Sequence, residues 1–469
     1  MTRYLCIHGH FYQPLREDPF VGQIPKEIGA DPWDNFNQKI TAECYRPNVQ
    51  LGNLEHISFN VGPTLLEWLQ EADPETYEGV ISADEKNVQK HGVGNALAQA
   101  YNHTILPLAT ERDKQVQIKW GIADFQARFG RKPDGMWLPE TAVDYATLEA
   151  LVGNDIQFVI LAPWQASDPC VDTTEPYLVP LPGGRSIAAF FYDAHLSGRI
   201  KPDPRTPYSA REFVRFSLPM RLNVPKCWSG NDQLLLLAND GENYGHTVLG
   251  RERFLYEVVY REAFEGGYQV TSLPRYLLHH HPTREMAIRE NTAWSCRHGL
   301  ERWKAHCACI REGTGEWKRP LRHALNELAG LLDEHYETFM GRLKLDSMQL
   351  LFDFIKVRSG WADPQQFLVS HGGQNLSNDK ASMVLTLLES QYYRQLMFTS
   401  CGFFFEDLSR IEPGNNIKFA AKAIVLAEKV VGQDLRAQFL ADLEQAKSWH
   451  TGVTGRDIFE KLLPAGQPR

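Results

Sequence analysis

The chain has 469 residues, of which 43% are hydrophobic and 23% are charged, and its formal net charge is −9 at pH 7. A chain of this length is too long to fold around one ordinary hydrophobic core, so two or three domains are expected. The acidic balance argues against nucleic acid or an anionic membrane as the main partner. No apolar run of about 18 residues occurs, so no membrane-spanning helix is expected, and the N-terminus turns polar too early for a secretory signal.

Short apolar runs typical of buried strands alternate with segments of helical periodicity in the first half of the chain. The predicted strands are Tyr4–Ile7, Ile57–Val61, Gly79–Ser82, Gly135–Leu138, Phe158–Leu161, Ile187–Tyr192 and Gln233–Ala238. The predicted helices are Gly62–Glu71, Val93–Ala109, Gln115–Phe129 and Tyr145–Val152. This alternation implies parallel strands with crossover connections. Polar residues at the strand ends favour an α/β barrel with its active site at that face.

The character of the chain changes after about Pro274. His279-His-His-Pro282 is a predicted linker, because proline blocks continuation of a helix. Five later segments carry the 3.6-residue apolar spacing of helices: Leu321–Met340, Gln349–Val357, Ala381–Met397, Asn416–Val431 and Leu435–Trp449. We therefore predict a barrel at residues 1–285 and a mainly α-helical domain at residues 286–469 that packs against it.

The first strand runs into His8-Gly-His10, two residues that share one face of a strand because side chains alternate. The same spacing occurs in metal-dependent hydrolases. The pair predicts a metal site, a pair of hydrogen bonds to a sugar ring, or satisfied core residues.

Glu140 ends the segment Gly135-Met-Trp137-Leu-Pro139-Glu140. The proline stiffens the chain, and Trp137 offers a flat apolar surface on which a sugar can stack. A glutamate held rigidly at a strand end can serve as a nucleophile when a second acid lies near. The alternative is an acidic residue at the N-terminus of the helix Tyr145–Val152.

Asp240-Gly-Glu242-Asn-Tyr-Gly-His246 follows four leucines, which predict a buried strand. Its two glycines would let a ligand approach the backbone closely. Burial and a neighbouring carboxylate raise the pKa of an aspartate in such a place, as a general acid requires. The alternative is an acidic turn that binds backbone N–H groups.

Eight cysteines are spread along the chain, and only Cys307 and Cys309 are close together in sequence. This pattern predicts reduced thiols in a cytoplasmic protein. With Cys296, His298 and His306 they suggest a zinc site, but structural zinc favours two to four residues between paired ligands. Buried packing thiols are the favoured interpretation.

Four of these regions, in chain order, resemble glycoside hydrolase family 57: His8-x-His10, Gly94–Leu108, Gly135–Glu140 and Asp240–His246. The resemblance covers roughly residues 1–275. The tail is similar to a domain of unknown function that accompanies one branch of that family, on the residues Trp294–Gly299, Arg302-Trp303 and Phe398–Asp407.

The resemblance implies a retaining enzyme on an incomplete seven-stranded (β/α) barrel that acts on α-glucans such as starch or glycogen. Glu140 corresponds to the nucleophile and Asp240 to the acid/base, with no metal or other cofactor. The expected substrate-binding residues are His8, His10, Gln13, His103, Trp137, Glu242, His246, His298 and Trp303. Many relatives have a glutamate where this sequence has Asn95, which bears on the substrate more than on the chemistry.

Two other classes of function stay open. His8, His10 and an acid suit a metal-dependent polysaccharide hydrolase or deacetylase. The same pocket without turnover would belong to a carbohydrate-binding protein. The expected partner is a carbohydrate in each case, and the sequence does not decide between hydrolysis and transfer.

Overall fold

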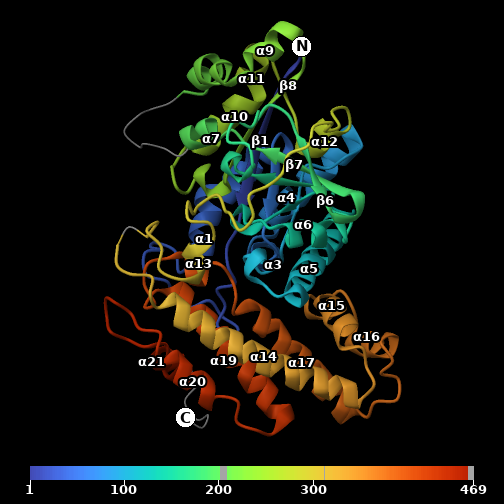
Figure 1. The fold of residues 1–469 in the computed structure, drawn as a ribbon, viewed down its shortest axis with the longest axis vertical. Helices are drawn as coiled ribbons and strands as arrows, with labels where there is room; N and C mark the ends of the chain where they lie inside the picture. Colours follow the sequence, from blue (N-terminus) through green and yellow to red (C-terminus); the bar gives the residue numbers. More distant parts are fainter. Residues whose placement is uncertain (201–208, 311, 463–469) are drawn as a thin grey trace. The chain divides into compact units, whose positions relative to one another are not determined.

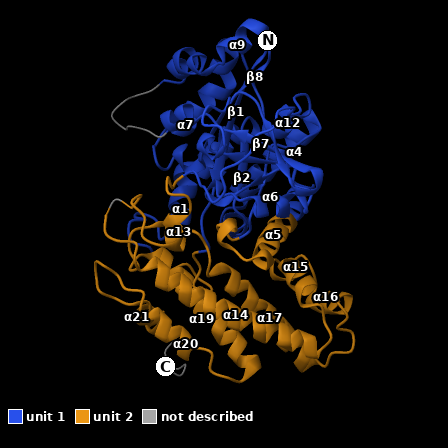
Figure 2. Ribbon diagram, in the orientation of Figure 1, with its two compact units in different colours: residues 1–15, 26–101, 125–294 blue, residues 16–25, 102–124, 295–469 orange. Residues whose placement is uncertain are grey.

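The computed structural model describes residues 1–200, 209–310 and 312–462 (Figure 1). The chain forms two compact units (Figure 2). Unit 1 contains residues 1–15, 26–101 and 125–294, and unit 2 contains residues 16–25, 102–124 and 295–469. The units are therefore not two consecutive stretches of sequence. The domains expected at 1–285 and 286–469, and the packing of one against the other, stay predictions.

Unit 1 is a mixed α/β structure built around parallel strands. The strands are β1 (Arg3–Phe11), β2 (Ser58–Val61), β3 (Ala98–Gln99), β4 (Met136–Trp137), β5 (Phe158–Leu161), β6 (Tyr177–Leu181), β7 (Arg185–Phe191), β8 (Gln233–Asp240) and β9 (Tyr268–Val270). Its longer helices are α3 (Pro63–Ala72), α4 (Pro74–His91), α6 (Tyr145–Val152), α7 (Ala194–Ile200) and α10 (Arg251–Glu257).

The pairings place seven strands in the order β8, β1, β2, β3, β4, β5 and β7, all parallel. Ladders join β8 to β1, β1 to β2, β3 to β4 and β5 to β7. Single parallel bridges between Phe59 and Ala96 and between Gly135 and Phe158 connect the remaining neighbours. Parallel strands direct their carboxyl ends to one edge, so the residues that follow them gather there.

The ends of this series are β7 and β8, which share no ladder in the described part of the chain. One backbone–backbone hydrogen bond, from the N–H of Asp193 to the carbonyl oxygen of Leu236 at 2.7 Å, links the residues after β7 to β8, and Ser197 adds two bonds that involve its side chain or that of Asn239. β6 pairs antiparallel with β7, and β9 pairs with the start of β1. Neither strand was predicted, because both are short and their apolar runs are interrupted.

Two predicted elements are wrong. Gly79–Ser82 is not a strand but lies inside α4, which Asp73 caps at the N-terminus and Gly92 ends at the C-terminus. Four apolar or small residues cannot be told from a strand by periodicity alone. The predicted helix Val93–Ala109 instead contains β3 and a short 3-10 turn, because this apolar run is buried on both sides rather than along one stripe.

The core of unit 1 lies beneath the strand ends. β8 is buried along its length up to Asp240, as its four leucines predicted. Leu234 and Leu236 pack with Cys6 of β1 and Phe190 of β7 in one apolar cluster. This cluster fixes the strands whose last residues carry the polar side chains.

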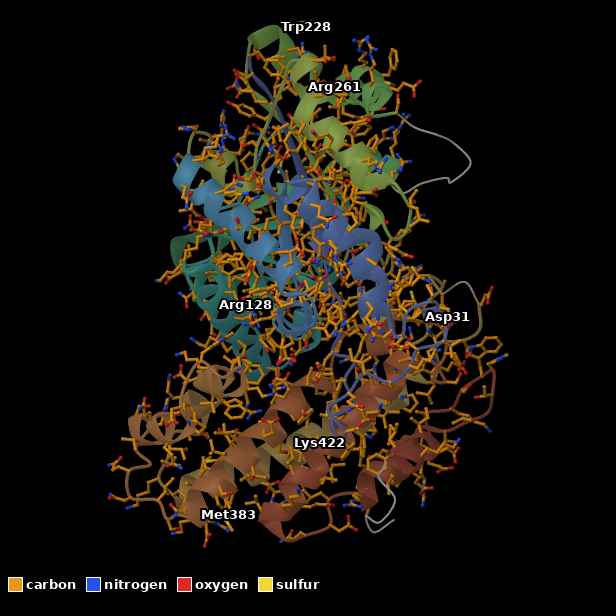
Figure 3. The ribbon with its side chains drawn as sticks, turned by 180° about the vertical axis from the view of Figure 1, so that it is seen from behind. Asp31, Arg128, Trp228, Arg261, Met383 and Lys422 are labelled. Carbon is orange, nitrogen blue, oxygen red and sulfur yellow. The ribbon has the colours of Figure 1, made fainter. Side chains whose placement is uncertain are left out.

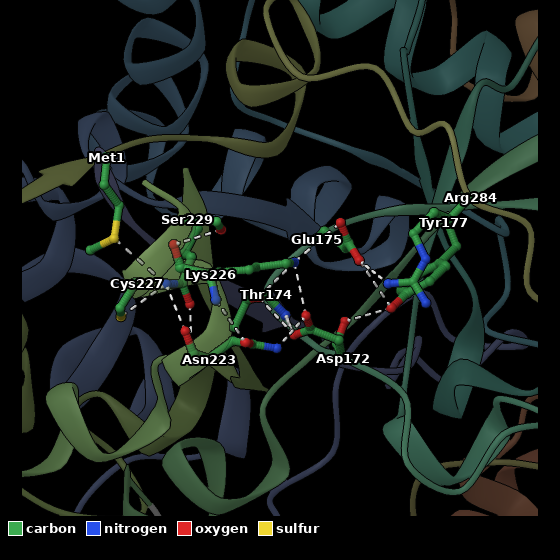
Figure 4. A network of polar contacts seen from close by, with 11 residues as sticks. Met1, Asp172, Thr174, Glu175, Tyr177, Asn223, Lys226, Cys227, Ser229 and Arg284 are labelled. Carbon is green, nitrogen blue, oxygen red and sulfur yellow. Dashed lines mark hydrogen bonds and ion pairs between the residues drawn. The ribbon is translucent and has the colours of Figure 1, made fainter. Parts of the chain in front are cut away.

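A polar network elsewhere in unit 1 holds the chain before β6 to α9 (Val224–Ser229) (Figure 4). Lys226 Nζ lies 2.8 Å from Asp172 Oδ2 and 3.1 Å from Glu175 Oε2. Asn223 Nδ2 donates to Asp172 Oδ2 at 2.8 Å. This network is structural, because each carboxylate has a cationic or amide partner. Trp228 of the same helix α9 lies at the surface and is 84% exposed (Figure 3).

Unit 2 is mainly helical, as predicted for the C-terminal region. Its helices are α13 (Glu301–Lys304), α14 (Lys318–Arg342), α15 (Ser347–Arg358), α16 (Pro364–Ser370), α17 (Asn378–Leu396), α18 (Cys401–Phe404), α19 (Ile411–Val431), α20 (Ala437–Leu443) and α21 (Gly455–Leu462). α14, α17 and α19 lie side by side (Figure 1). α5 (Glu111–Phe129) begins in unit 2 and ends in unit 1.

A buried ion cluster ties the segment 102–124 into unit 2. Arg394 of α17 is 2% exposed and donates to Asp113 Oδ1 at 2.5 Å and to Asp333 Oδ2 at 2.7 Å. Gln395 Nε2 donates to Asp113 Oδ1 at 2.7 Å. Burial alone would raise the pKa of Asp113. The positive charge of Arg394 and these hydrogen bonds outweigh that effect and hold the pKa below its usual range.

No helix within the described ranges is long and apolar enough to cross a membrane. The expected cytoplasmic location stays a prediction.

Candidate active site

The candidate active site of unit 1 starts with the two histidines of β1. His8 and His10 share one face of the strand, and both imidazoles stack on the indole of Trp137, with centroids 4.9 Å and 4.8 Å away. Trp137 is fully buried at the end of β4. Its Nε1 has no hydrogen-bond partner among the described residues, and an orphaned buried donor calls for an explanation such as a ligand or a water.

Asn60 holds the histidine pair in place. It is the register partner of His10 in the β1–β2 ladder, and its Oδ1 lies 3.2 Å from His8 Nε2 and 3.2 Å from His10 Nδ1. Ser58 Oγ lies 3.2 Å from His8 Nδ1. Burial lowers the pKa of both histidines to about 3, so both rings are neutral near pH 7. Neutral imidazoles can donate and accept hydrogen bonds at the same time.

Glu140 stands on a turn directly after β4. Its backbone has the left-handed conformation, with φ of 59° and ψ of 19°. Trp294 Nε1 donates to its Oε2 at 2.8 Å, and the Trp294 backbone N–H donates to its carbonyl oxygen at 2.9 Å. α6 is capped by Asp144, whose side chain accepts from the N–H of Thr147, so Glu140 is not needed at that helix terminus.

Asp240 is the last residue of β8 and the register partner of His10 in the β1–β8 ladder. Burial raises the pKa of Tyr192 well above its ordinary value, and the negative charge of Asp240 raises it further. The ring of Tyr192 lies 6.4 Å from that of Trp294, the indole that contacts Glu140. The two predicted carboxylates both lie at the carboxyl edge of the parallel strands, with Asp240 in register with His10 and Glu140 in contact with Trp294.

Glu242 forms a second acidic position two residues after Asp240. It accepts from the Tyr45 hydroxyl at 2.6 Å and from the backbone N–H of Tyr12 at 3.0 Å. Burial raises the pKa of Glu242 to about 7, and the Asp240 charge adds to this rise while the Tyr45 hydrogen bond opposes it. Gln13 Nε2 donates to Tyr45 Oη at 3.2 Å, which joins Gln13 to the same group.

The end of this motif is fixed by protein contacts. His246 Nδ1 lies 2.5 Å from Glu43 Oε2. A Cβ at Gly241 would lie 2.2 Å from the Phe11 ring, and one at Gly245 would lie 2.4 Å from the carbonyl oxygen of Glu43. The expectation that these glycines make room for a ligand is therefore corrected: they make room for the protein itself.

Three predicted substrate-binding residues belong to unit 2. His103 Nδ1 lies 2.6 Å from Ser400 Oγ. Trp303 is fully buried, with its ring 6.4 Å from that of Phe404. His298 is exposed and faces cysteine sulfurs. Their contact with substrate stays a prediction.

Sequence reasoning missed Asn60 and Tyr45, which position the histidines and Glu242. Asn60 had a visible signal, since it is one of two polar residues in the otherwise apolar strand Ile57–Val61 and lies near its end. Tyr45 had none, because it lies on an irregular helical segment (Thr41–Tyr45) far from the motifs.

Asn95, the departure noted in the sequence, has a structural task. It is 1% exposed, and its Nδ2 donates to the carbonyl oxygens of Leu54 and Ile57, each at 2.6 Å. Asp84 Oδ1 accepts from the Asn95 backbone N–H at 2.7 Å. An amide donor is required here, because two carbonyl oxygens converge on the side chain.

Carboxylates, neutral histidines and aromatic rings at the carboxyl edge of a parallel sheet define a glycosidase-like site, and comparison with known families agrees. Residues 25–289 match glycosyl hydrolase family 57, and residues 314–467 match a domain of unknown function (DUF3536). The first match spans more than half of the chain, which therefore belongs to glycosyl hydrolase family 57.

The chain is also similar to three proteins of known name. Over 158 residues the chain is 26% identical to alpha-amylase 1 of Dictyoglomus thermophilum. The matched stretch covers 34% of this chain and only 21% of that protein. An exo-type maltose-forming amylase from Pyrococcus sp. ST04 shares the fold with a TM-score of 0.76 at 15% identity, over 98% of this chain and 88% of that one. A GH57-type branching enzyme from Pyrococcus horikoshii does so with a TM-score of 0.63 at 15% identity, over 99% and 98%.

Proposed function

We propose that this protein is a retaining glycoside hydrolase or transglycosylase acting on α-glucan oligo- or polysaccharides, with Glu140 as nucleophile and Asp240 as acid/base. One observation supports the proposal: two carboxylates follow separate parallel strands, with Asp240 in register with His10 and Glu140 bound by Trp294, whose ring lies 6.4 Å from that of His10. Glycosidases use a pair of carboxyl groups in two distinct roles. Membership of family 57 supports the same pair.

We infer that the seven parallel strands form an incomplete barrel, open between β7 and β8. The strand order and the absence of a ladder between β7 and β8 in the described residues support this inference. An opening there leaves the Asp240 end of β8 without a ladder on one side, where Ser197 of α7 accepts a hydrogen bond from the Ala238 N–H at 3.1 Å.

The proposed reaction has two steps. Glu140 attacks the anomeric carbon while Asp240 transfers its proton to the departing glycosidic oxygen, which gives a glycosyl ester and a free sugar hydroxyl. Asp240, now ionised, then removes a proton from water or from another sugar hydroxyl. That oxygen attacks the anomeric carbon and Glu140 departs as a carboxylate. Retention requires the two carboxyl groups to lie about 5–5.5 Å apart.

The surroundings of the pair suit these roles. The indole N–H of Trp294 stabilises an ionised Glu140, as a nucleophile requires. Neutral His8 and His10 can hydrogen-bond sugar hydroxyls without adding positive charge beside the developing oxocarbenium ion. The names of the similar proteins, an amylase and a branching enzyme, support α-glucan as the substrate class.

The metal-dependent alternative is disfavoured by hydrogen bonding at the histidines. His8 has a polar partner at each ring nitrogen, Ser58 at Nδ1 and Asn60 at Nε2. A metal ligand keeps one nitrogen for the metal.

The test is a panel of linear and branched α-glucans followed by proton NMR of the first products. We expect α-configured products and their loss in Glu140→Gln, a nearly isosteric change. A β-configured first product would overturn the retaining mechanism. Binding of oligosaccharide without turnover on any linkage would favour the carbohydrate-binding alternative.

A further inference from the structure

Four side chains of unit 2 gather in a geometry that the proposed reaction does not use. They are Cys296, His298, Cys307 and Cys309, and one ligand atom from each lies within 4.8 Å of all the others. Cys296 and Cys307 are buried, Cys309 is partly exposed and His298 is exposed. The group therefore has a buried side that excludes water and an exposed side through which an ion can enter.

We propose that these residues form a structural Zn²⁺ site of the Cys₃His type. Four protein ligands close the tetrahedral coordination sphere, whereas a catalytic zinc keeps one position for water. Three thiolates and a neutral imidazole are the donors that zinc prefers in proteins.

The distances match a tetrahedral centre. Bonds of about 2.3 Å to sulfur and about 2.0–2.1 Å to nitrogen would place two sulfurs about 3.8 Å apart and a sulfur and a nitrogen about 3.6 Å apart. Cys296 Sγ lies 3.6 Å from Cys307 Sγ and 3.9 Å from Cys309 Sγ. His298 Nδ1 lies 3.2 Å from Cys307 Sγ and 3.4 Å from Cys309 Sγ. A disulfide would need about 2.05 Å between sulfurs.

Backbone N–H groups already point at the sulfurs. The N–H of Cys309 donates to Cys307 Sγ at 3.5 Å, and the N–H of Arg297 donates to the sulfur of Cys309. Such donors favour thiolates and orient them, as in the outer shell of known metal sites.

A buried cation supplies the charge balance. Zinc with three thiolates and a neutral imidazole carries a net charge of −1. Lys318 is fully buried near Cys296 and Cys307, and its Nζ donates to the carbonyl oxygen of Arg302 at 2.8 Å. A metal–thiolate centre gives this lysine an opposite charge, which a buried ammonium requires.

The fold explains how these residues can form a zinc site although the Cys307-x-Cys309 spacing is shorter than structural zinc favours. Cys296-x-His298 and Cys307-x-Cys309 are two short pairs, and the turn and four-residue helix α13 between them bring the pairs face to face. In the described part of 295–317, α13 is the only helix or strand. A metal ion would therefore cross-link the two ends of this segment. The segment also contacts α14, because the carbonyl oxygens of Arg302 and Trp303 accept hydrogen bonds from Lys318 and Arg322.

The first experiment measures metal in the full-length protein without a histidine tag, after dialysis against a weak chelator. We expect one zinc per chain. Cys307→Ser and His298→Ala should retain roughly a tenth or less of it, because even outer-shell losses cost about 10–100-fold in affinity. The matched control is Cys170→Ser, an exposed cysteine of unit 1, which should keep the full content. Equal zinc in the wild type and both ligand variants would overturn the site.

The second experiment needs no variant. Cobalt replacing zinc in the wild type should give a thiolate-to-cobalt charge-transfer band and intense tetrahedral visible bands. Hydrogen exchange across residues 295–310 should slow with metal, while β1 stays unchanged. Cobalt without the thiolate band would place the metal on nitrogen or oxygen ligands and overturn the proposal, as would a Cys296–Cys307 disulfide in the freshly purified protein.

Discussion

Trp294 contacts Glu140 twice: its indole N–H donates to the carboxylate at 2.8 Å and its backbone N–H donates to the carbonyl oxygen at 2.9 Å. The first contact orients the carboxylate, and the second holds the turn on which Glu140 stands. Trp294 is thus a positioning residue for the proposed nucleophile.

Trp294→Phe should keep the ring packing and lose the indole donor. A hydrogen bond to a charged group contributes about 1.5–3 kcal/mol, so kcat should fall about 10- to 100-fold with little change in KM. Steady-state kinetics on the best α-glucan measure this. Trp228→Phe, at an exposed position of α9, is the matched control. Unchanged kcat in Trp294→Phe would mean that Glu140 does not depend on this donor.

Asp240→Asn should remove the proton donor and leave the fold intact. On natural glucans kcat/KM should fall about 10²- to 10⁴-fold, the range of general acid catalysis. A glycoside with a nitrophenolate leaving group needs no protonation, so its first step should lose far less. Asp155→Asn, whose side chain is 83% exposed, serves as control. Equal losses on both substrates would argue against the acid role of Asp240.

Glu242→Gln should change how stability depends on pH. The folded-state pKa of Glu242 is about 7 against an ordinary value of 4.5, so the folded state binds more protons between these values. Wild-type stability therefore falls as pH rises from about 4.5 to about 7, by up to about 3 kcal/mol from this group. The variant should gain on the wild type across this window in urea titrations. A difference that is constant with pH would contradict the raised pKa.

Asn95→Ala should destabilise unit 1 without touching the carboxylates. It leaves the carbonyl oxygens of Leu54 and Ile57 without their donor, at a cost of about 1–3 kcal/mol. Asn95→Glu should cost more, because a buried carboxylate would face two carbonyl oxygens. Thermal unfolding measures both. Asn154→Ala, at a partly exposed position, is the control, and an equal loss there would remove the special role of Asn95.

Strand ends were predictable from the sequence because the signal is local. Leu234–Leu237 running into Asp240, and the alternation of His8 and His10, place these side chains at a sheet edge without knowledge of the partner strands. Glu140 was found the same way, but its left-handed backbone and its contact with Trp294 were not, since Trp294 is 154 residues away.

The features that sequence patterns did not reveal have a common physical reason. Gly79–Ser82 resembles a strand only until Asp73 and Gly92 are recognised as the ends of one long helix. The cysteine group was judged by ligand spacing, yet a turn and α13 decide whether Cys296 meets Cys307. In each case the outcome depends on chain geometry beyond the window in which a pattern can be read.

The path of residues 102–124 has a consequence for any attempt to divide the protein. This segment lies within the family 57 match at 25–289, yet its Asp113 is held by Arg394 and Gln395. A cut after residue 294 would leave the buried carboxylate of Asp113 without its partner Arg394. It would also expose Trp120, whose Nε1 donates to the carbonyl oxygen of Leu351. Excision of the helical half therefore does not yield a minimal enzyme. It removes part of the scaffold that the N-terminal half of the sequence helps to build.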